Sequence, residues 1–102
     1  MSLEKNISRL LSRKDEIEDR LVSSSLSPSE LMNLSKELAE IRPVVEQAVK
    51  LQRLKTELDD ALILLKDPEA DSDMKSLGDE EIKEIRPKII AEEHMLKLLL
   101  LP

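Results

Sequence analysis

The stretch SPSELMNLSKELAEI, residues 27–41, decides the fold. It opens on Ser27 and Pro28, with Glu30 close behind. This pattern starts helices, because the serine oxygen caps an early amide, proline loses nothing at the first helical position, and the glutamate completes a capping box. Apolar residues then recur at intervals of three or four along one helix face: Leu31, Leu34, Leu38 and Ile41. The stretch therefore predicts the first turns of an amphipathic helix.

The same periodicity extends this helix to about residue 66 and predicts two more, over about residues 2–23 and 72–101. The central helix continues through Val45, Leu51, Leu54, Leu58, Ala61 and Leu65, and its stripe slips by one residue near Pro43. The first helix carries Leu3, Ile7, Leu10, Ile17 and Leu21. The third carries Met74, Leu77, Ile82, Ile85, Ile89, Leu96 and Leu99. Two short breaks separate the helices, and Asp67 before Pro68 ends the central one.

Two prolines and one glycine interrupt these patterns. The tetrapeptide EIRP occurs twice, ending at Pro43 and at Pro87. Neither proline follows a capping residue, so we expect kinks within continuous helices and not breaks. Gly78, the single glycine, is expected to be a soft point of the third helix.

The composition supports an all-α fold. The 102 residues include no aromatic residue, no cysteine and one glycine, and 37% of them are charged. Such a chain has little from which to build a sheet. We therefore predict one domain, residues 1–102, folded as an antiparallel bundle of three long amphipathic helices, coiled-coil-like, with proline kinks.

The charge is unevenly distributed. The net charge is −6, which argues against direct binding of nucleic acid. Residues 67–102 hold ten acidic and five basic side chains, and most of the acids lie between Asp67 and Glu84. This stretch would favour a basic partner, and the candidate docking residues are Asp71, Asp73, Glu80 and Glu81. No membrane segment or targeting sequence is recognisable, which predicts a cytosolic protein.

No catalytic, metal or cofactor site is predicted. His94 is the only histidine, and it lacks the Glu-x-x-His spacing of metal sites in helical bundles, so a surface position is expected. No nucleophile has a base within reach, and no glycine-rich loop could hold a phosphate. Met32, Met74 and Met95 lie on or beside the apolar stripes and are expected in the core.

The end of the chain, HMLKLLLLP at residues 94–102, is unusually apolar. We expect the leucines to finish the third helix at a domain junction, with part of Leu98, Leu99, Leu100 and Leu101 exposed and available for self-association. Two hypotheses then stand. In the first, the chain is a domain of a larger protein and docks protein partners. In the second, it is a free-standing coiled-coil adaptor that oligomerises or binds a partner helix.

Three segments carry a resemblance to a known family: LSKELAEIRPVVEQ at residues 34–47, DPEA at 67–70 and LKLLLLP at 96–102. In this order they resemble the N-terminal domain of bacterial class I peptide chain release factors, of the type that reads UAA and UAG. The resemblance covers nearly the whole chain.

The resemblance implies a helical docking domain that acts in translation termination at stop codons. Its implied partners are the ribosome, near the stalk base, and the GTPase that recycles the factor. The family's codon-reading Pro-x-Thr loop and its Gly-Gly-Gln loop, which triggers hydrolysis of peptidyl-tRNA, have no counterpart in these residues. No catalytic or codon-reading residue is therefore carried over.

Overall fold

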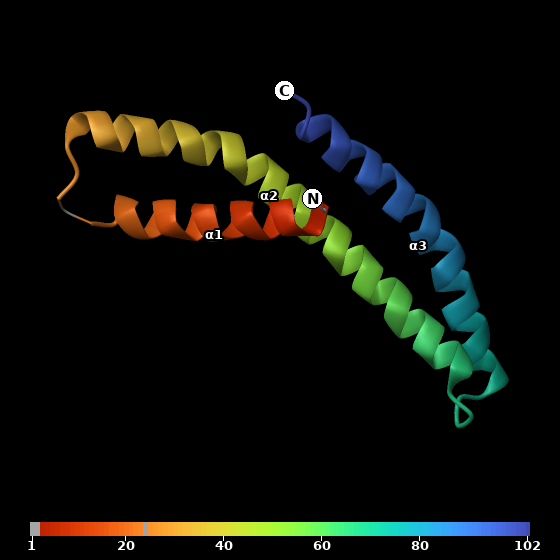
Figure 1. Ribbon diagram of the computed structural model, residues 1–102. Coiled ribbons are helices and arrows are strands. Elements are labelled where there is room, and N and C mark those ends of the chain that lie inside the picture. The colour runs from red at the N-terminus through yellow and green to blue at the C-terminus, as the bar shows by residue number, and fades with distance from the viewer. Residues whose placement is uncertain (1–2, 24) are drawn as a thin grey trace. The chain divides into compact units, whose positions relative to one another are not determined.

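The computed structural model describes residues 3–23 and 25–102, and over these ranges it contains three helices and no strand. The helices are α1 (Leu3–Leu21), α2 (Pro28–Lys66) and α3 (Ser72–Leu99) (Figure 1). The predicted all-α class is thus confirmed. The expected first residue of α1, residue 2, lies outside the described residues, as does the side chain of Leu3. The chain divides into two compact units, Met1–Ala48 and Val49–Pro102, and α2 contributes to both.

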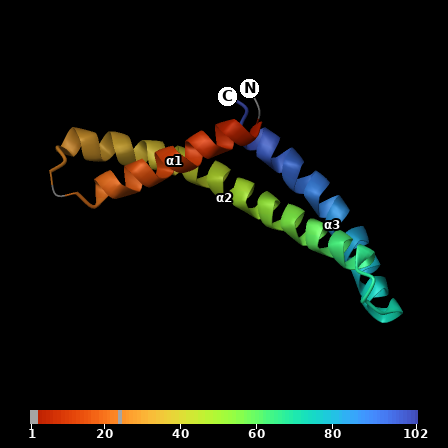
Figure 2. The ribbon, with the colours of Figure 1, turned by 60° about the horizontal axis from the view of Figure 1, so that its bottom comes forward.

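In the first unit, α1 lies antiparallel to the first part of α2 (Figures 1 and 2). A buried cluster joins the two helices: Ile17, Leu34, Leu38, Ile41 and Val45, with Leu10, Leu21 and Leu26 packed against it. Burying each such side chain contributes about 1.5–3 kcal/mol. Leu31 was expected in this stripe but is 49% exposed, although the Arg20–Glu30 ion pair shows that this turn of α2 still lies beside α1.

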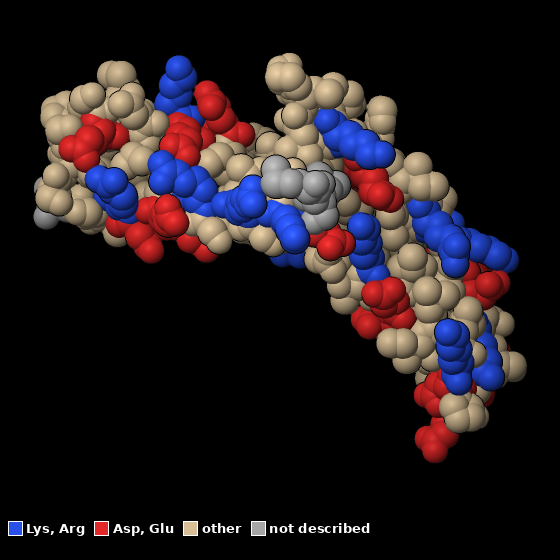
Figure 3. All heavy atoms as spheres, in the orientation of Figure 1, with Lys and Arg blue, Asp and Glu red and all other residues tan. Residues whose placement is uncertain are grey.

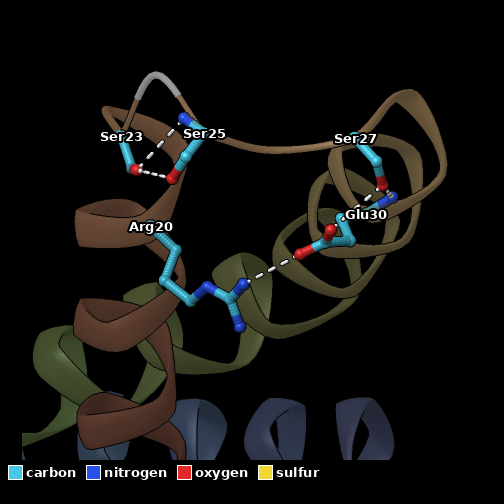
Figure 4. A network of polar contacts seen from close by, with 5 residues as sticks. All are labelled: Arg20, Ser23, Ser25, Ser27 and Glu30. Carbon is cyan, nitrogen blue, oxygen red and sulfur yellow. Dashed lines mark hydrogen bonds and ion pairs between the residues drawn. The ribbon is translucent and has the colours of Figure 1, made fainter.

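The connection between α1 and α2 begins the second helix as the sequence predicts (Figure 4). The Ser27 hydroxyl oxygen accepts the Glu30 amide proton at 3.1 Å, which caps the helix. The Glu30 carboxylate accepts a hydrogen bond from the Ser27 hydroxyl at 3.1 Å, in place of the bond from the Ser27 backbone amide that a capping box has. Its second oxygen lies 2.9 Å from the Arg20 guanidinium of α1. The cap of α2 is therefore bonded directly to the end of α1.

A second ion pair repeats this bond one heptad further along the helix pair. The Arg13 guanidinium donates to both carboxylate oxygens of Glu37, at 2.5 and 2.8 Å. Arg13 and Arg20 are seven residues apart on α1, and Glu37 and Glu30 are seven apart on α2 in the opposite direction. Equal steps in opposite directions are the mark of an antiparallel coiled-coil register.

These contacts shift the pKa values of the groups involved. The hydrogen bond from Arg13 lowers the pKa of Glu37 below its ordinary value of 4.5, although partial desolvation opposes this shift. The same bond raises the pKa of Arg13. Glu18 on α1 also has a lowered pKa, mainly through its contact with Lys14 at 2.5 Å. The charged forms of both carboxylates are thus the ones that the first unit stabilises.

In the second unit, the later part of α2 runs antiparallel to α3. Lys50, near the start of this part, lies 3.2 Å from Glu92, while Leu64 and Leu65, near its end, approach Gly78. The buried residues of α3 are Gly78, Ile82, Ile85, Ile89 and Leu96, and those of α2 in this unit include Leu51 and Ala61. The two helices therefore bury one continuous stripe against each other.

The prediction that the α3 stripe is buried is wrong for three of its residues. Leu77, Met74 and Leu99 are 61%, 44% and 39% exposed. The buried residues follow intervals of four, three, four and seven that begin at Gly78, and Leu77 lies one residue, or about 100° of helix rotation, away from that line. Leu99 is the last helical residue, next to the cap at Leu100.

The glycine and the two prolines do not interrupt the helices. α2 continues through Pro43, and α3 continues through Gly78 and Pro87. Val44 and Val45 are both buried, and the α2 stripe changes register by one residue here, as predicted near Pro43. Gly78 is buried against α2, so the expected soft point is instead a packing position.

The Arg13–Glu37 pair predicts a pH-dependent stability. Because the folded pKa of Glu37 is depressed, the native state binds fewer protons than the unfolded state as the pH approaches 4.5 from above. The pair's contribution is present above this pH and is lost as the pH falls through the folded pKa. We expect Glu37→Gln to lower the free energy of unfolding at neutral pH and to match the wild type in acid. Urea unfolding over a pH series measures this, with Glu40→Gln as the exposed control on the same helix. A constant difference between Glu37→Gln and the wild type at every pH would contradict the assignment.

Gly78 offers a prediction of increased stability. A Cβ atom placed there meets the Ala61 carbonyl oxygen and the Leu64 and Leu65 methyl carbons at 3.5 Å each, which is ordinary van der Waals contact. Since glycine costs a helix interior roughly 0.5–1 kcal/mol relative to alanine, Gly78→Ala should raise the free energy of unfolding by about that amount. Gly78→Leu should lower it, because the space beyond Cβ is filled. Thermal unfolding of the two variants checks both signs, and a destabilised alanine variant would show that the packing is tighter than described.

Candidate docking surface

The loop between α2 and α3 is built from acidic residues whose carboxylates bond the backbone. Asp67 Oδ1 accepts the Glu69 amide proton at 2.9 Å, which closes a turn after α2. Asp71 is the N-cap of α3, and its Oδ1 accepts the Met74 amide proton at 2.8 Å. Between them, Ala70 is buried and anchors the loop. The acidic loop is therefore stabilised by hydrogen bonds from its own side chains to its backbone.

All four predicted docking residues are exposed, and they lie at this end of the second unit. Asp73 and Glu80 are seven residues apart on α3 and share one face, whereas Glu81 lies about 100° further round the helix. Asp71 stands at the cap. Acidic side chains gather at the loop end in Figure 3, with basic side chains close by. Lys83, for example, lies 3.1 Å from Asp79. Asp73 and Glu80 thus lie on one face of α3, two turns apart, and Asp71 also caps the helix.

An exposed apolar residue lies within this acidic face. Leu77 is 61% exposed, and it lies between Asp73 and Glu80 on α3. The periodicity of the sequence could not reveal it, because the same apolar residue fitted the expected buried stripe. A docking face with charge at its edges and an apolar residue at its centre is typical of protein interfaces.

The chain end is partly exposed, as expected. Leu98, Leu99, Leu100 and Leu101 are 48%, 39%, 37% and 66% exposed. Their self-association remains a prediction. The expectation that Met32, Met74 and Met95 are core residues is wrong, since they are 72%, 44% and 47% exposed. Met32 lies two residues before Leu34, which places it on nearly the opposite face of α2.

The described parts of the chain contain no group of three or more histidine, aspartate or glutamate side chains that could hold a metal ion. His94 is exposed. A shallow depression on α1 is lined by Ser8, Arg9, Ser12, Arg13 and Glu16. Because one helix supplies all of its lining, it is a surface groove and not an enclosed binding site.

Comparison with known proteins assigns the amino-acid sequence to a family. The family model described as the PCRF domain matches residues 6–102. The chain belongs to the PCRF domain family. No solved structure matches this PCRF domain. None of the helices in the described ranges combines length and hydropathy sufficient to cross a bilayer.

Relatives of this PCRF domain share one name. The chain is 43% identical over 102 residues to peptide chain release factor 1 of Rhodospirillum rubrum, covering 100% of the chain and 28% of that relative. It is 36% identical over 107 residues to peptide chain release factor 1 of Wolbachia pipientis, covering 100% of the chain and 29% of the relative. A third protein of this name, from Ruegeria pomeroyi, is 36% identical over 81 residues. The resemblance to class I release factors of type 1 is confirmed, and the chain spans less than a third of these relatives' length.

The double role of Asp71 can be separated by substitution. Asp71→Ala removes the acceptor of the Met74 amide and should lower the free energy of unfolding by about 1 kcal/mol. Asp71→Asn keeps an acceptor oxygen without the charge, and we expect most of the stability to remain. Chemical denaturation of the two variants measures the difference. Equal losses in both would mean that the charge at the helix end, and not the cap, is what stabilises α3.

Proposed function

We propose that this PCRF domain is the N-terminal, non-catalytic docking domain of a longer type 1 release factor, and that it acts in translation termination. The observation that carries the proposal is the 43% identity over the full 102 residues to a protein named peptide chain release factor 1, of which the chain spans 28%. The match of residues 6–102 to the PCRF domain supports the same function. The site of action would be the ribosome in the bacterial cytoplasm.

The chemistry of termination would belong to other parts of that longer protein. Residues 1–102 contain a single glycine and therefore no Gly-Gly-Gln loop. Hydrolysis of peptidyl-tRNA and the reading of UAA and UAG would require segments that this chain does not include. The contribution of the present domain is then to bind, to orient and to transmit contacts, through rigid helices that are well suited to hold a surface in place.

The acidic face of α3 is our candidate for the docking contact. Asp73, Glu80 and Glu81 are exposed and surround Leu77, and their negative potential would steer the domain toward a basic protein surface. Basic ribosomal proteins near the stalk base are the partner class that we infer, and the GTPase that recycles release factors is a second one. Asp71 contributes charge to this face while it caps the helix.

The alternative, a free-standing coiled-coil adaptor, is less well supported. A coiled-coil adaptor requires only an apolar stripe, whereas this chain matches a release-factor family over 97 of its residues, from 6 to 102. Reading the gene beyond the codon for Pro102 separates the two. A frame that continues into Pro-x-Thr and Gly-Gly-Gln motifs supports the release factor, and an immediate stop codon supports the adaptor.

A chimeric release factor tests the proposal. The matching segment of Rhodospirillum rubrum release factor 1 is replaced by this chain, and peptide release is measured on ribosomes stalled at UAA and UAG codons. We expect release close to that of the parent. The triple variant Asp73→Lys, Glu80→Lys, Glu81→Lys should raise KM several-fold with little change in kcat, because it weakens binding and not chemistry. The KM of the triple variant should also depend less on salt concentration than that of the unmodified chimera.

The matched control for this chimera is the triple variant Asp15→Lys, Asp19→Lys, Glu40→Lys, which makes the same charge change at exposed positions of the first unit. A folded chimera that binds ribosomes no better than a release factor without this segment would contradict the docking function. Normal release by the triple variant, with unchanged salt dependence, would contradict only the choice of the acidic face.

A further inference from the structure

The C-terminal half of α3 carries a second apolar face that nothing in the described structure covers. Ile90, Met95 and Leu98 are 69%, 47% and 48% exposed. Pro87 and Ala91 are exposed as well. The series 87, 91, 95 and 98 advances by four, four and three residues, which keeps these side chains on one helix face. Over this part α3 is therefore apolar both toward α2 and away from it.

The exposed charges beside this strip have one sign, and the nearest exposed acid, Glu84, lies one turn before Pro87. Between residues 86 and 101 the exposed charged side chains are Arg86, Lys88 and Lys97, and all of them are basic. The two acids of this segment are partly buried, and Glu92 is bonded to Lys50 of α2 at 3.2 Å. The preceding half of α3, with its cap, has the opposite character: exposed acids lie at positions 71, 73, 79, 80, 81 and 84, and Lys83 is the one exposed base among these described residues. One helix thus presents an acidic half and an apolar half with basic edges.

We propose that the strip Pro87, Ile90, Ala91, Met95 and Leu98 binds an acidic amphipathic helix of a partner protein. The partner's apolar residues would lie on the strip, and its carboxylates would meet Arg86, Lys88 and Lys97 at the edges. The aliphatic stems of these basic side chains would extend the apolar contact while their charges fix the partner's chemistry. From Pro87 to Leu98 the strip is about 17 Å long, which suits a helix of three to four turns.

A second copy of this chain fits the strip less well. In a symmetric dimer the same patch faces itself, so the basic edges of one copy would meet those of the other. Like charges across an interface oppose association. An acidic helix satisfies both the apolar strip and its edges, and this charge complementarity selects it as the occupant. The inference goes beyond the proposed function, since it concerns a different face and needs no ribosome.

Two fluorescent peptides of about 16 residues test the proposal with the 102-residue chain itself. Both form amphipathic helices with leucine on one face; one carries glutamate and the other lysine on the remaining positions. We expect the acidic peptide to bind in an anisotropy titration at least about tenfold more tightly than the basic one, and to weaken with added salt. Ile90→Lys and Leu98→Lys should each weaken its binding about tenfold or more.

Matched controls distinguish binding at the strip from nonspecific hydrophobic binding. Ile63 is 66% exposed on α2, and Ile63→Lys should leave binding unchanged. The triple variant Arg86→Glu, Lys88→Glu, Lys97→Glu changes only exposed residues and should reverse the preference between the peptides. Circular dichroism of each variant verifies that the helices remain.

Two results would overturn the proposal. One is equal affinity for both peptides, or affinity for the acidic peptide that survives Ile90→Lys and Leu98→Lys. The other is a concentration-dependent dimer in sedimentation that Leu98→Lys abolishes while neither peptide binds, which would assign the strip to a second copy.

Discussion

The structure depends on one helix that must bury apolar surface against two different neighbours. α2 has 39 residues, and it packs with α1 over its first part and with α3 over its later part. An isolated helix of ordinary composition is only marginally stable in water, and most of its stability comes from a covered apolar face. Each unit therefore needs its own stripe on α2. The adjacent buried residues Val44 and Val45 mark the place where one stripe gives way to the other.

Much of this arrangement could be predicted from the sequence because local signals agree with the global fold. Ser27 and Glu30 form the predicted cap, and Leu34, Leu38 and Ile41 form the predicted core. Periodicity was insufficient where two apolar residues are adjacent. At positions 77 and 78 the more hydrophobic residue is exposed, and the glycine is buried because α2 comes close there. Sequence alone does not contain the distance between two helices, so it could not make that choice.

The candidate site was predictable in its charge and not in its geometry. The acidity around Asp73 and Glu80 is visible in the sequence, and exposed carboxylates are the ordinary outcome for such residues. One carboxylate oxygen of Asp71 accepts the Met74 amide proton. This bond depends on the backbone conformation at the helix start, which the charge pattern does not contain. The exposed strip near Met95 escaped prediction for a related reason. When a helix is apolar on two faces, the pattern does not say which face is covered.

The distribution of charged residues along α3 distinguishes its acidic face from its apolar strip. A net charge of −6 describes the chain poorly, because the exposed acids of this helix lie in its first half and three of its four exposed bases, all but Lys83, lie in its second half. Within the coiled-coil contacts of the first unit, charges are matched in pairs such as Arg13 with Glu37, which satisfies them inside the fold. In the C-terminal half of α3, Glu92 is paired with Lys50 of α2, and Arg86, Lys88 and Lys97 remain exposed. A helix that needed only to be solvated would gain nothing from exposing Ile90 and Met95 between those bases. Apolar surface held at a rigid position, with edges of one sign, has the physical form of a binding surface with a defined partner chemistry.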